Sequence, residues 1–317
     1  MTDKATKFFT HPIVIVLGAL LCTALWGSAT PAIKIGYEHI LPVRDVPSTI
    51  LFAGVRFFFA GIITVIIYSI AKRRMLYPKP SNLGRIMIVG AFQTILQYLF
   101  FYIGLANTTG VKGTIASGAS AFFILLISAF IFRQERFTLK KLVAVLLGFT
   151  SIVVANLTGL TLDMNLVGDG FVILSTIFYA FSTLFVKRFS AYEDTVVISG
   201  YQFIFGGAVM ILIGLILGGR IVLGSATAVA ILVYLSFLSA VAYALWGLLI
   251  KYNTVSRIAV FSFMTPVFGV ILSEIFMPGE GQVKPLNLVF ALLLVSLGIF
   301  MLNYQPHQNQ SERVGDE

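Results

Sequence analysis

The feature that most constrains this chain is a succession of apolar stretches, each about long enough to cross a lipid bilayer as a helix. Hydrophobic residues make up 58% of the 317 residues and charged residues only 11%, unlike the usage of soluble domains. Within the hydrocarbon layer every backbone polar group must be hydrogen-bonded inside the protein, which favours helices. The chain is therefore predicted to be an all-α integral membrane protein.

Ten spans of this kind are expected, and they leave few residues for a separate soluble domain. They cover residues 12–35, 49–70, 86–105, 113–132, 142–157, 171–186, 196–217, 228–250, 254–277 and 286–302. The first is too long for the apolar part of a typical signal peptide, so we expect it to be retained. The tail, residues 305–317, is polar and without periodicity, and we expect it to be disordered and cytoplasmic.

Lysine and arginine are distributed unevenly between the two sets of loops. If the N-terminus is cytoplasmic, sixteen of the 22 basic residues lie on that side, five lie on the other, and Arg56 lies within a span. Loops on the cytoplasmic side of membrane proteins are enriched in Lys and Arg. We therefore expect both termini to be cytoplasmic.

The second half of the chain repeats the first. Shifts of 145, 146 and 153 residues place Tyr98 on Tyr243, Val55–Gly61 on Tyr201–Gly207, and Leu25–Lys34 on Phe178–Lys187. Chance similarity among apolar segments is the alternative, but three matches in the same order at nearly equal shifts favour duplication. Each copy, 12–157 and 168–304, has five spans. Because five is odd, the second copy enters from the opposite side, which predicts two inverted five-helix repeats.

The motifs that carry this pattern also resemble a known family. They are LWGSATPAIK (25–34), VRFFFAG (55–61), RQERFT (133–138), VGDGFVILSTIFYAFSTLFVKR (167–188) and FSFMTPVFGVIL (261–272), followed by Gly279 and Glu280. As an ordered pair of sets they resemble the drug/metabolite transporter superfamily, in the family whose halves are called EamA domains. The resemblance covers essentially the whole membrane region. It implies a ten-helix transporter with a central cavity, moving small organic solutes and most often exporting them.

A proline stands in the middle of the apolar stretch Phe261–Phe276. Pro266 has no N–H to bond to the carbonyl of Ser262, so we expect a bent or broken helix with a polar opening at membrane depth. Such an opening is a candidate binding site. Members of the resembled family often have this proline in both halves, whereas the first half here has Ala121. The helix from Gly113 is therefore expected to be straighter than its mate.

Polar and aromatic side chains recur at helical spacing inside several of the apolar stretches, and residues three, four or seven apart share a helix face. These faces are predicted to line a cavity that binds a small amphipathic solute. The candidate residues are Trp26, Thr30, Gln93, Gln97, Tyr98, Tyr179, Ser182, Tyr243, Trp246 and Pro266. The alternative is helix packing for Ser and Thr and an interfacial position for Tyr and Trp.

Two ionisable residues inside the predicted spans are candidates for a function. Arg56 is the deepest, and its repeat mate is Gln202, which favours a structural hydrogen-bonding role over substrate contact. Glu274 is a candidate coupling residue that could bind and release a proton or pair with a cationic solute. It lies about 12 Å beyond Pro266 at 1.5 Å per residue, where a carboxylate could instead reach interfacial water.

The sequence contains no signature of an enzyme. It has neither GxxxxGK[ST] for nucleotide phosphates nor HExxH for zinc, and its one cysteine, Cys22, cannot form an internal disulfide. We expect no cofactor, metal site or nucleic-acid partner. A membrane-bound enzyme acting on lipid-like substrates would need a cluster of titratable groups, and a receptor or scaffold would need longer loops.

The sequence therefore predicts a multi-pass secondary transporter of the plasma (inner) membrane, with the lipid bilayer and a small-molecule substrate as its partners. It is expected to move amino acids or related metabolites by alternating access. Export is the favoured direction, and proton coupling is a further possibility that depends on Glu274. The alternative is a gradient-driven facilitator or importer of similar solutes.

Overall fold

The structure of the protein is a computed structural model that describes residues 2–157, 160, 163–276 and 284–304. These residues are helical, without a β-strand. The helices are α1 (Thr2–Thr10), α2 (Pro12–Ile40), α3 (Val46–Ala71), α4 (Leu83–Gly90), α5 (Gln97–Ala106), α6 (Gly110–Gly118), α7 (Ser120–Leu126), α8 (Leu139–Ala155), α9 (Phe171–Phe189), α10 (Thr195–Ile216), α11 (Ala226–Tyr252), α12 (Val255–Ala259), α13 (Met264–Phe276) and α14 (Pro285–Asn303). The expected tail, 305–317, and the residues Gly279 and Glu280 lie outside the described residues.

Nine helical segments in the described part of the chain are long and apolar enough to cross a membrane. They cover 12–40, 46–71, 80–106, 110–131, 166–189, 195–216, 226–252, 255–276 and 286–303. Turns of π-helix, Ala91–Leu96, Ile127–Ile131 and Leu166–Gly170, complete three of these segments. The remaining expected span, 142–157, corresponds to α8, which has 17 residues.

Short polar side chains set where several of these helices begin. Asp45 accepts a hydrogen bond from the backbone N–H of Ser48 at 2.8 Å, and Asp194 accepts one from Val196 at 2.9 Å. Thr109, Thr138 and Ser225 cap α6, α8 and α11 in the same way. Each cap satisfies a backbone donor that the first turn of a helix leaves unpaired, so the turn sequences place the helix ends.

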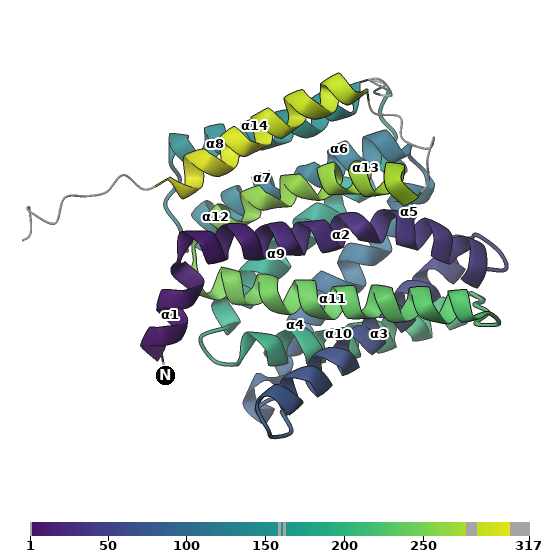
Figure 1. Cartoon of the computed structure of the whole chain (residues 1–317). Coiled ribbons are helices and arrows are strands. Elements are labelled where there is room, and N and C mark those ends of the chain that lie inside the picture. Colours follow the sequence, from purple (N-terminus) through teal and green to yellow (C-terminus); the bar gives the residue numbers. More distant parts are fainter. Residues whose placement is uncertain (1, 158–159, 161–162, 277–283, 305–317) are drawn as a thin grey trace, which may run out of the picture.

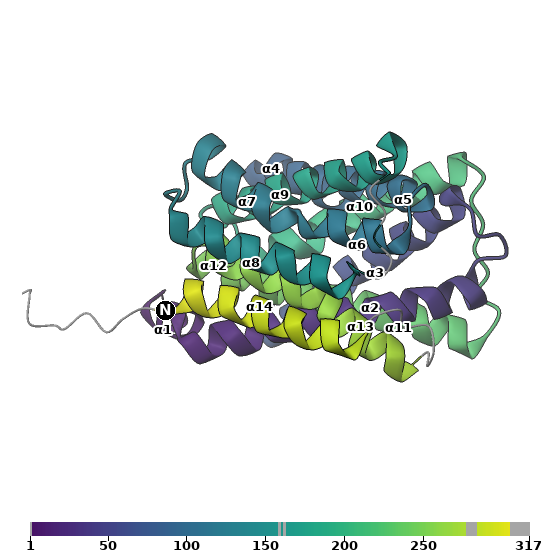
Figure 2. The same cartoon turned by 90° about the horizontal axis from the view of Figure 1, so that it is seen from above.

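The helices form two layers, which are seen from above in Figure 2. α3 packs on α10 at one edge of the bundle, and α8 packs along α14 at the opposite edge (Figure 1). Between these edges, α2 lies against α11 and α13, while α9 lies against α5 and α7. Since the shift of 153 residues makes α2 equivalent to α9, each half packs its first helix against the third and fourth helices of the other half.

The crossing of α3 and α10 is made through glycines. A Cβ at Gly207 would lie 2.8 Å from the carbonyl oxygen of Gly54, and one at Gly61 would lie 2.5 Å from that of Gly200. The shift of 146 residues makes Gly54 equivalent to Gly200 and Gly61 equivalent to Gly207. The crossing therefore looks the same from either half, and the two helices run antiparallel.

Two equivalent helices are interrupted near their middles. The 3₁₀ turn Val260–Phe263 separates α12 from α13 just before Pro266, where the sequence predicts a break. The helix from Gly113, which the sequence predicts to be straighter than its mate, is also interrupted, at the single residue Ala119 between α6 and α7. The backbone N–H of Ala119 bonds to the carbonyl of Ala116 at 3.1 Å, which tightens the turn. Small residues, Gly118 beside Ala119, allow this without a proline.

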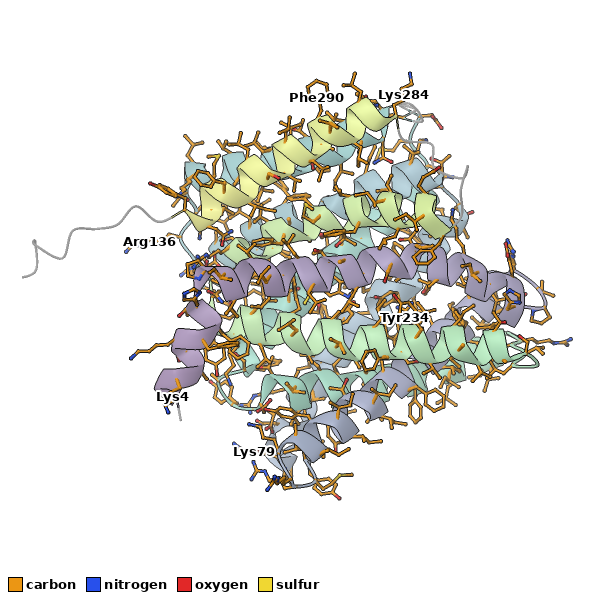
Figure 3. All side chains as sticks on the ribbon, in the orientation of Figure 1. Lys4, Lys79, Arg136, Tyr234, Lys284 and Phe290 are labelled. Carbon is orange, nitrogen blue, oxygen red and sulfur yellow. The ribbon has the colours of Figure 1, made fainter. Side chains whose placement is uncertain are left out.

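The two ends of the described chain lie at the same end of the bundle. The Phe9 ring of α1 stacks on Tyr252 at a centroid distance of 5.3 Å, and the Asn253 amide donates to the Phe9 carbonyl at 2.9 Å. At this end the Lys140 ammonium also donates to the carbonyl of Tyr304, just after α14. Figure 3 shows Lys4 and Arg136 at this end and Lys284 at the other.

Candidate functional site

Four of the predicted residues meet where the two halves face each other. The Trp26 ring of α2 lies 4.9 Å from the Trp246 ring and 5.2 Å from the Tyr243 ring, both on α11. The hydroxyl oxygens of Tyr98, on α5, and Tyr243 are 3.0 Å apart. Tyr179 of α9 packs against the same core. We call Trp26, Tyr98, Tyr179, Tyr243 and Trp246 the aromatic cluster.

Contacts between equivalent residues place the local symmetry axis at this cluster. Tyr98 and Tyr243 are mates under the shift of 145 residues, and their hydroxyl groups bond to each other. Phe57 and Phe203 are mates under the shift of 146, and their rings stack at 5.1 Å and 8°. Phe57 lies 4.5 Å from Tyr98, and Phe203 lies 4.9 Å from Tyr243. Residues that contact their own mates must lie beside the axis that relates the two halves.

The sequence reasoning did not identify Phe57, Phe203 and Tyr102 as part of this region. Phe57 and Phe203 stand in the repeat motifs VRFFFAG and YQFIFGG, next to Arg56 and Gln202. Tyr102 follows Tyr98 by one helical turn, and their rings are 5.9 Å apart. A search for large side chains at matched positions of both copies could have found the phenylalanines, and the one-turn spacing could have found Tyr102.

Several buried polar atoms in and beside the cluster have no hydrogen-bond partner in the described chain. They are the indole nitrogens of Trp26 and Trp246, the Gln97 amide oxygen, and Nε and Nη1 of Arg56. A buried polar atom without a partner costs free energy, about 1–3 kcal/mol for a neutral group. Such atoms are rare in native proteins and mark places where a missing molecule supplies the bond.

The remaining predicted residues are spread around the cluster. Ser182 is fully buried, and its hydroxyl donates to the Tyr179 carbonyl one turn earlier at 2.8 Å, as a packing residue would. Gln93 is buried on the π-helical turn before Gln97. Thr30 is exposed. Pro266 is half-buried in the first turn of α13.

The candidate coupling residue lies away from this centre along the chain. Glu274 is exposed in the last turn of α13, which ends at Phe276. This position agrees with a carboxylate that reaches the rim of the membrane region.

Burial differs within the cluster, because Trp26, Tyr98 and Tyr179 are half-buried whereas Tyr243 and Trp246 are buried. Tyr243 exposes 7% of its surface and Trp246 exposes 3%. Two shallow surface grooves lie elsewhere, one beside Tyr234 and one at residues 129–137.

Polar contacts close the bundle at the end where α1 lies. The Glu135 carboxylate accepts a hydrogen bond from the backbone N–H of Ser256, in the first turn of α12, at 3.1 Å. It also accepts one from the Ser256 hydroxyl, and its Oε2 lies 2.7 Å from the Lys141 ammonium. Glu135 therefore ties the loop before α8, in the first half, to the second half.

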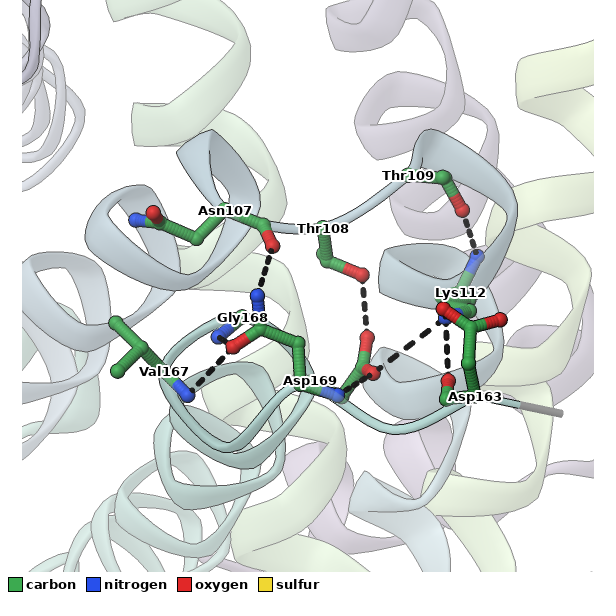
Figure 4. A network of polar contacts seen from close by, with 9 residues as sticks. Asn107, Thr108, Thr109, Lys112, Asp163, Val167, Gly168 and Asp169 are labelled. Atoms are coloured by element: carbon green, nitrogen blue, oxygen red, sulfur yellow. Dashed lines mark hydrogen bonds and ion pairs between the residues drawn. The ribbon is translucent and has the colours of Figure 1, made fainter. Parts of the chain in front are cut away.

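A second network closes the other end and is drawn in Figure 4. The Lys112 ammonium lies 2.9 Å from the Asp163 carboxylate, and the Thr108 hydroxyl donates to Asp169. The Asn165 amide donates to the Asn107 carbonyl at 3.1 Å. These contacts tie the turn between α5 and α6 to the segment before α9, so each end of the bundle has its own polar closure.

The fold and the site define a multi-pass helical membrane protein whose two matched halves enclose a buried aromatic cluster. Comparison with known families agrees with this class, because the EamA-like transporter family matches residues 13–157 and 166–304. The chain belongs to the EamA-like transporter family. The resemblance predicted from the sequence motifs is confirmed by this match.

Three similar proteins are named as a transporter or an efflux pump. An uncharacterized transporter of Archaeoglobus fulgidus is 25% identical over 285 residues, which cover 89% of this chain and 96% of that protein. A probable amino-acid metabolite efflux pump of Salmonella typhimurium is 23% identical over 88% of this chain and 91% of its own. A protein of the same name from Escherichia coli is 24% identical over 94% of this chain and 97% of its own length.

A solved crystal structure shares the fold. It aligns with a TM-score of 0.74 and 18% identity, covering 90% of this chain and 95% of that chain.

Proposed function

We propose that the protein is a secondary transporter that moves amino acids or related small metabolites across the plasma membrane, as an exporter working by alternating access. The aromatic cluster between the two halves carries this proposal. Symmetric contacts such as Tyr98–Tyr243 place it at the axis, where opposite movements of two inverted repeats expose one site to each side in turn.

The proposed topology has ten crossings, with α8 as the fifth and both termini in the cytoplasm. At 1.5 Å per residue, the 17 residues of α8 span about 26 Å, slightly less than the hydrocarbon core of about 30 Å. A small adjustment of the bilayer accommodates this difference. The uneven distribution of Lys and Arg supports this orientation.

The chemistry of the site supports a small amphipathic solute. Aromatic faces bind the apolar part of such a molecule, and the unpaired indole N–H groups of Trp26 and Trp246 and the Gln97 carbonyl bind its polar part. The names of the relatives from Salmonella typhimurium and Escherichia coli support amino-acid metabolites and outward transport. The proposal includes no cofactor.

The polar contacts at the two ends support alternating access. Opening toward one side requires the Glu135–Ser256 contact to break, and opening toward the other requires the Lys112–Asp163 network to break. In this mechanism one closure stays intact while the other opens. The proton gradient is the proposed energy source, with Glu274 as the coupling group.

The test is stabilisation of the purified protein against heat by a panel of amino acids, amines, nucleosides and small acids. A ligand that binds the folded state raises its stability, by about 2.7 kcal/mol at a hundred times its Kd. We expect amino acids or their derivatives to stabilise the wild type and to lose this effect in Tyr243→Ala and Trp246→Ala. Tyr234→Ala, on the same helix but 41% exposed, is the matched control and should keep it.

Ligand effects that persist in both cluster variants would contradict the proposed site. Proteoliposomes then decide the mode of transport. An exporter concentrates solute against its gradient when the proton gradient is imposed, whereas flux that follows the solute gradient alone identifies a facilitator.

A further inference from the structure

One positively charged residue is buried in the described part of the chain. Arg56, on α3, exposes 4% of its surface. Its guanidinium carbon lies 4.4 Å from the centre of the Phe57 ring. Its buried nitrogens Nε and Nη1 make no hydrogen bond. A guanidinium held in this way is ready to bond to a molecule from outside the chain.

No carboxylate of the described chain neutralises Arg56. Arg44, Lys112 and Lys141, by contrast, each pair with a carboxylate. Arginine cannot lose its proton in a protein, and an unpaired charge in a membrane interior is costly. The cation–π contact with Phe57 offsets only a small part of this cost, about 1–2 kcal/mol. An anion at this position would offset much more.

Gln202 is the repeat mate of Arg56 and shows how a polar side chain is held at the equivalent position of the second half. Gln202 is fully buried, and its amide oxygen accepts a hydrogen bond from the Thr94 hydroxyl at 2.7 Å, whereas its amide nitrogen has no partner in the described chain. The structural role that the sequence favours for Arg56 therefore fits Gln202, whereas Arg56 has no such bond. Both mates have a buried nitrogen without a partner, but Arg56 is charged and Gln202 is neutral, so the missing partner costs more free energy at Arg56.

The position of Arg56 connects it to the aromatic cluster. The Phe57 ring beside its guanidinium lies 4.5 Å from the Tyr98 ring of the cluster. Further hydrogen-bond donors without partners, the indole N–H groups of Trp26 and Trp246, belong to the same cluster. A region with unpaired donors and one buried positive charge suits a ligand that brings acceptor oxygens and one negative charge.

We propose that Arg56 binds the carboxylate of the transported solute, so that the substrates are carboxylic acids whose apolar part lies among the rings of the aromatic cluster. This assignment rests on the proposed transport function and names its substrate class. The planar guanidinium matches a carboxylate with two parallel hydrogen bonds. A single buried positive charge balances a carboxylate, whereas a doubly charged phosphate would need a second cation.

The test compares each acid with an amide of the same shape. Leucine and leucinamide, and phenylalanine and phenylalaninamide, differ in the carboxylate and otherwise share their side chains. Binding to the purified wild-type protein is measured from ligand-dependent thermal stability. We expect the acids to bind at least about tenfold more tightly than the amides, the effect of about 1.4 kcal/mol.

Variants at Arg56 test whether this residue causes the preference for acids over amides. Arg56→Gln, which introduces the residue of the repeat mate, should bind acid and amide alike. Arg56→Lys keeps the charge without the planar fork and should retain part of the preference for acids. If Arg56→Gln does not fold, Arg56→Lys is compared with the wild type instead, and an unchanged preference for acids in Arg56→Lys would overturn the assignment.

Flux into proteoliposomes separates this inference from the proposed function. If amides are transported and bound as well as acids, the protein is a transporter and the role of Arg56 is overturned. If the protein transports neither acids nor amides, the proposed function itself fails, and the assignment fails with it. A preference for acids that survives Arg56→Gln would also overturn the assignment.

Discussion

At the scale of single residues, the contact between Tyr98 and Tyr243 joins two side chains that duplication made equivalent. Their hydroxyl oxygens are 3.0 Å apart in the interior of the protein. In such a pair one hydroxyl donates and the other accepts, so the accepting hydroxyl keeps its own proton for another partner. The two tyrosine hydroxyls therefore differ in their free hydrogen-bonding groups. The accepting hydroxyl can still donate a hydrogen bond to a solute.

Removal of either hydroxyl should lower the free energy of unfolding. Removal of the second hydroxyl should lower it little further. We expect Tyr98→Phe and Tyr243→Phe each to lower the free energy of unfolding by about 1 kcal/mol. The double variant should lose nearly the same amount, because each single substitution already breaks the shared bond. Denaturant unfolding in detergent measures all four proteins. Losses that simply add would mean that the two hydroxyls do not interact.

Glu274 allows a separate prediction about coupling. If its carboxylate carries the coupling proton, Glu274→Gln abolishes solute accumulation driven by the proton gradient but leaves exchange of solute across the membrane. Both fluxes are measured with labelled solute in the same proteoliposomes. Driven accumulation at the wild-type rate in Glu274→Gln would exclude this residue as the coupling group.

At the scale of helices, the glycines of the α3–α10 crossing let two backbones approach closely. A Cβ at Gly207 would lie 2.4 Å from the backbone nitrogen of Phe58, which cannot turn aside as a side chain could. Close approach of this kind is how membrane helices gain packing energy, because lipid offers no hydrophobic driving force between them. The crossing therefore holds the two halves together at one edge.

One methyl group should disturb this crossing. We expect Gly207→Ala to lower the free energy of unfolding by about 1–3 kcal/mol, the usual cost of overpacking. Gly84→Ala is the matched control, because a Cβ at Gly84, on α4, would meet no atom within 4 Å. The control should be neutral or slightly stabilising, since alanine favours helix more than glycine. Equal effects of the two substitutions would contradict the role of the crossing.

At the scale of the whole molecule, the two polar closures determine which side of the protein can open. Cys22 is a natural reporter of this opening, because it is the one cysteine of the chain and is completely buried. It packs in the same core as Trp246. A thiol reagent can reach it only when the helices around the cluster separate.

Loss of the Glu135 closure should expose this thiol. We expect Glu135→Gln to speed the reaction of Cys22 with a membrane-permeable maleimide several-fold, because the neutral amide loses the Lys141 ion pair and binds Ser256 more weakly. Glu193→Gln is the control, because Glu193 instead joins α10 to the Lys79 loop. Unchanged labelling of Cys22 in Glu135→Gln would show that this contact does not govern opening.

Helical spacing predicted which side chains of a helix share a face, but it could not tell the residues of the aromatic cluster from packing residues. Spacing alone brings Tyr243 and Trp246 to one face of α11, and both belong to the cluster. The same argument selected Ser182, whose hydroxyl bonds within its own helix. A face that points inward looks the same in sequence whether its side chains meet a cavity or another helix, so pattern alone cannot separate binding from packing.

The interruption of the first-half helix was missed for a related reason. The prediction relied on proline, which breaks a helix wherever it stands, and the first half has Ala121 instead of proline. The interruption at Ala119 lies beside Gly118, where a neighbouring helix approaches closely. A Cβ at Gly118 would lie 2.5 Å from Ile152 of α8, and such contacts depend on how the helices are arranged.

The sequence by itself determined that this protein is a helical membrane protein made of two related halves, because apolar length and repeated motifs act along the chain and need no partner. The tertiary structure decided which residues meet. It brought Tyr98 to Tyr243 and Phe57 to Phe203, and it left Arg56 buried without a carboxylate. The partners of Tyr98 and Phe57 lie more than a hundred positions away in the sequence, and only the packing of the helices brings such residues into contact.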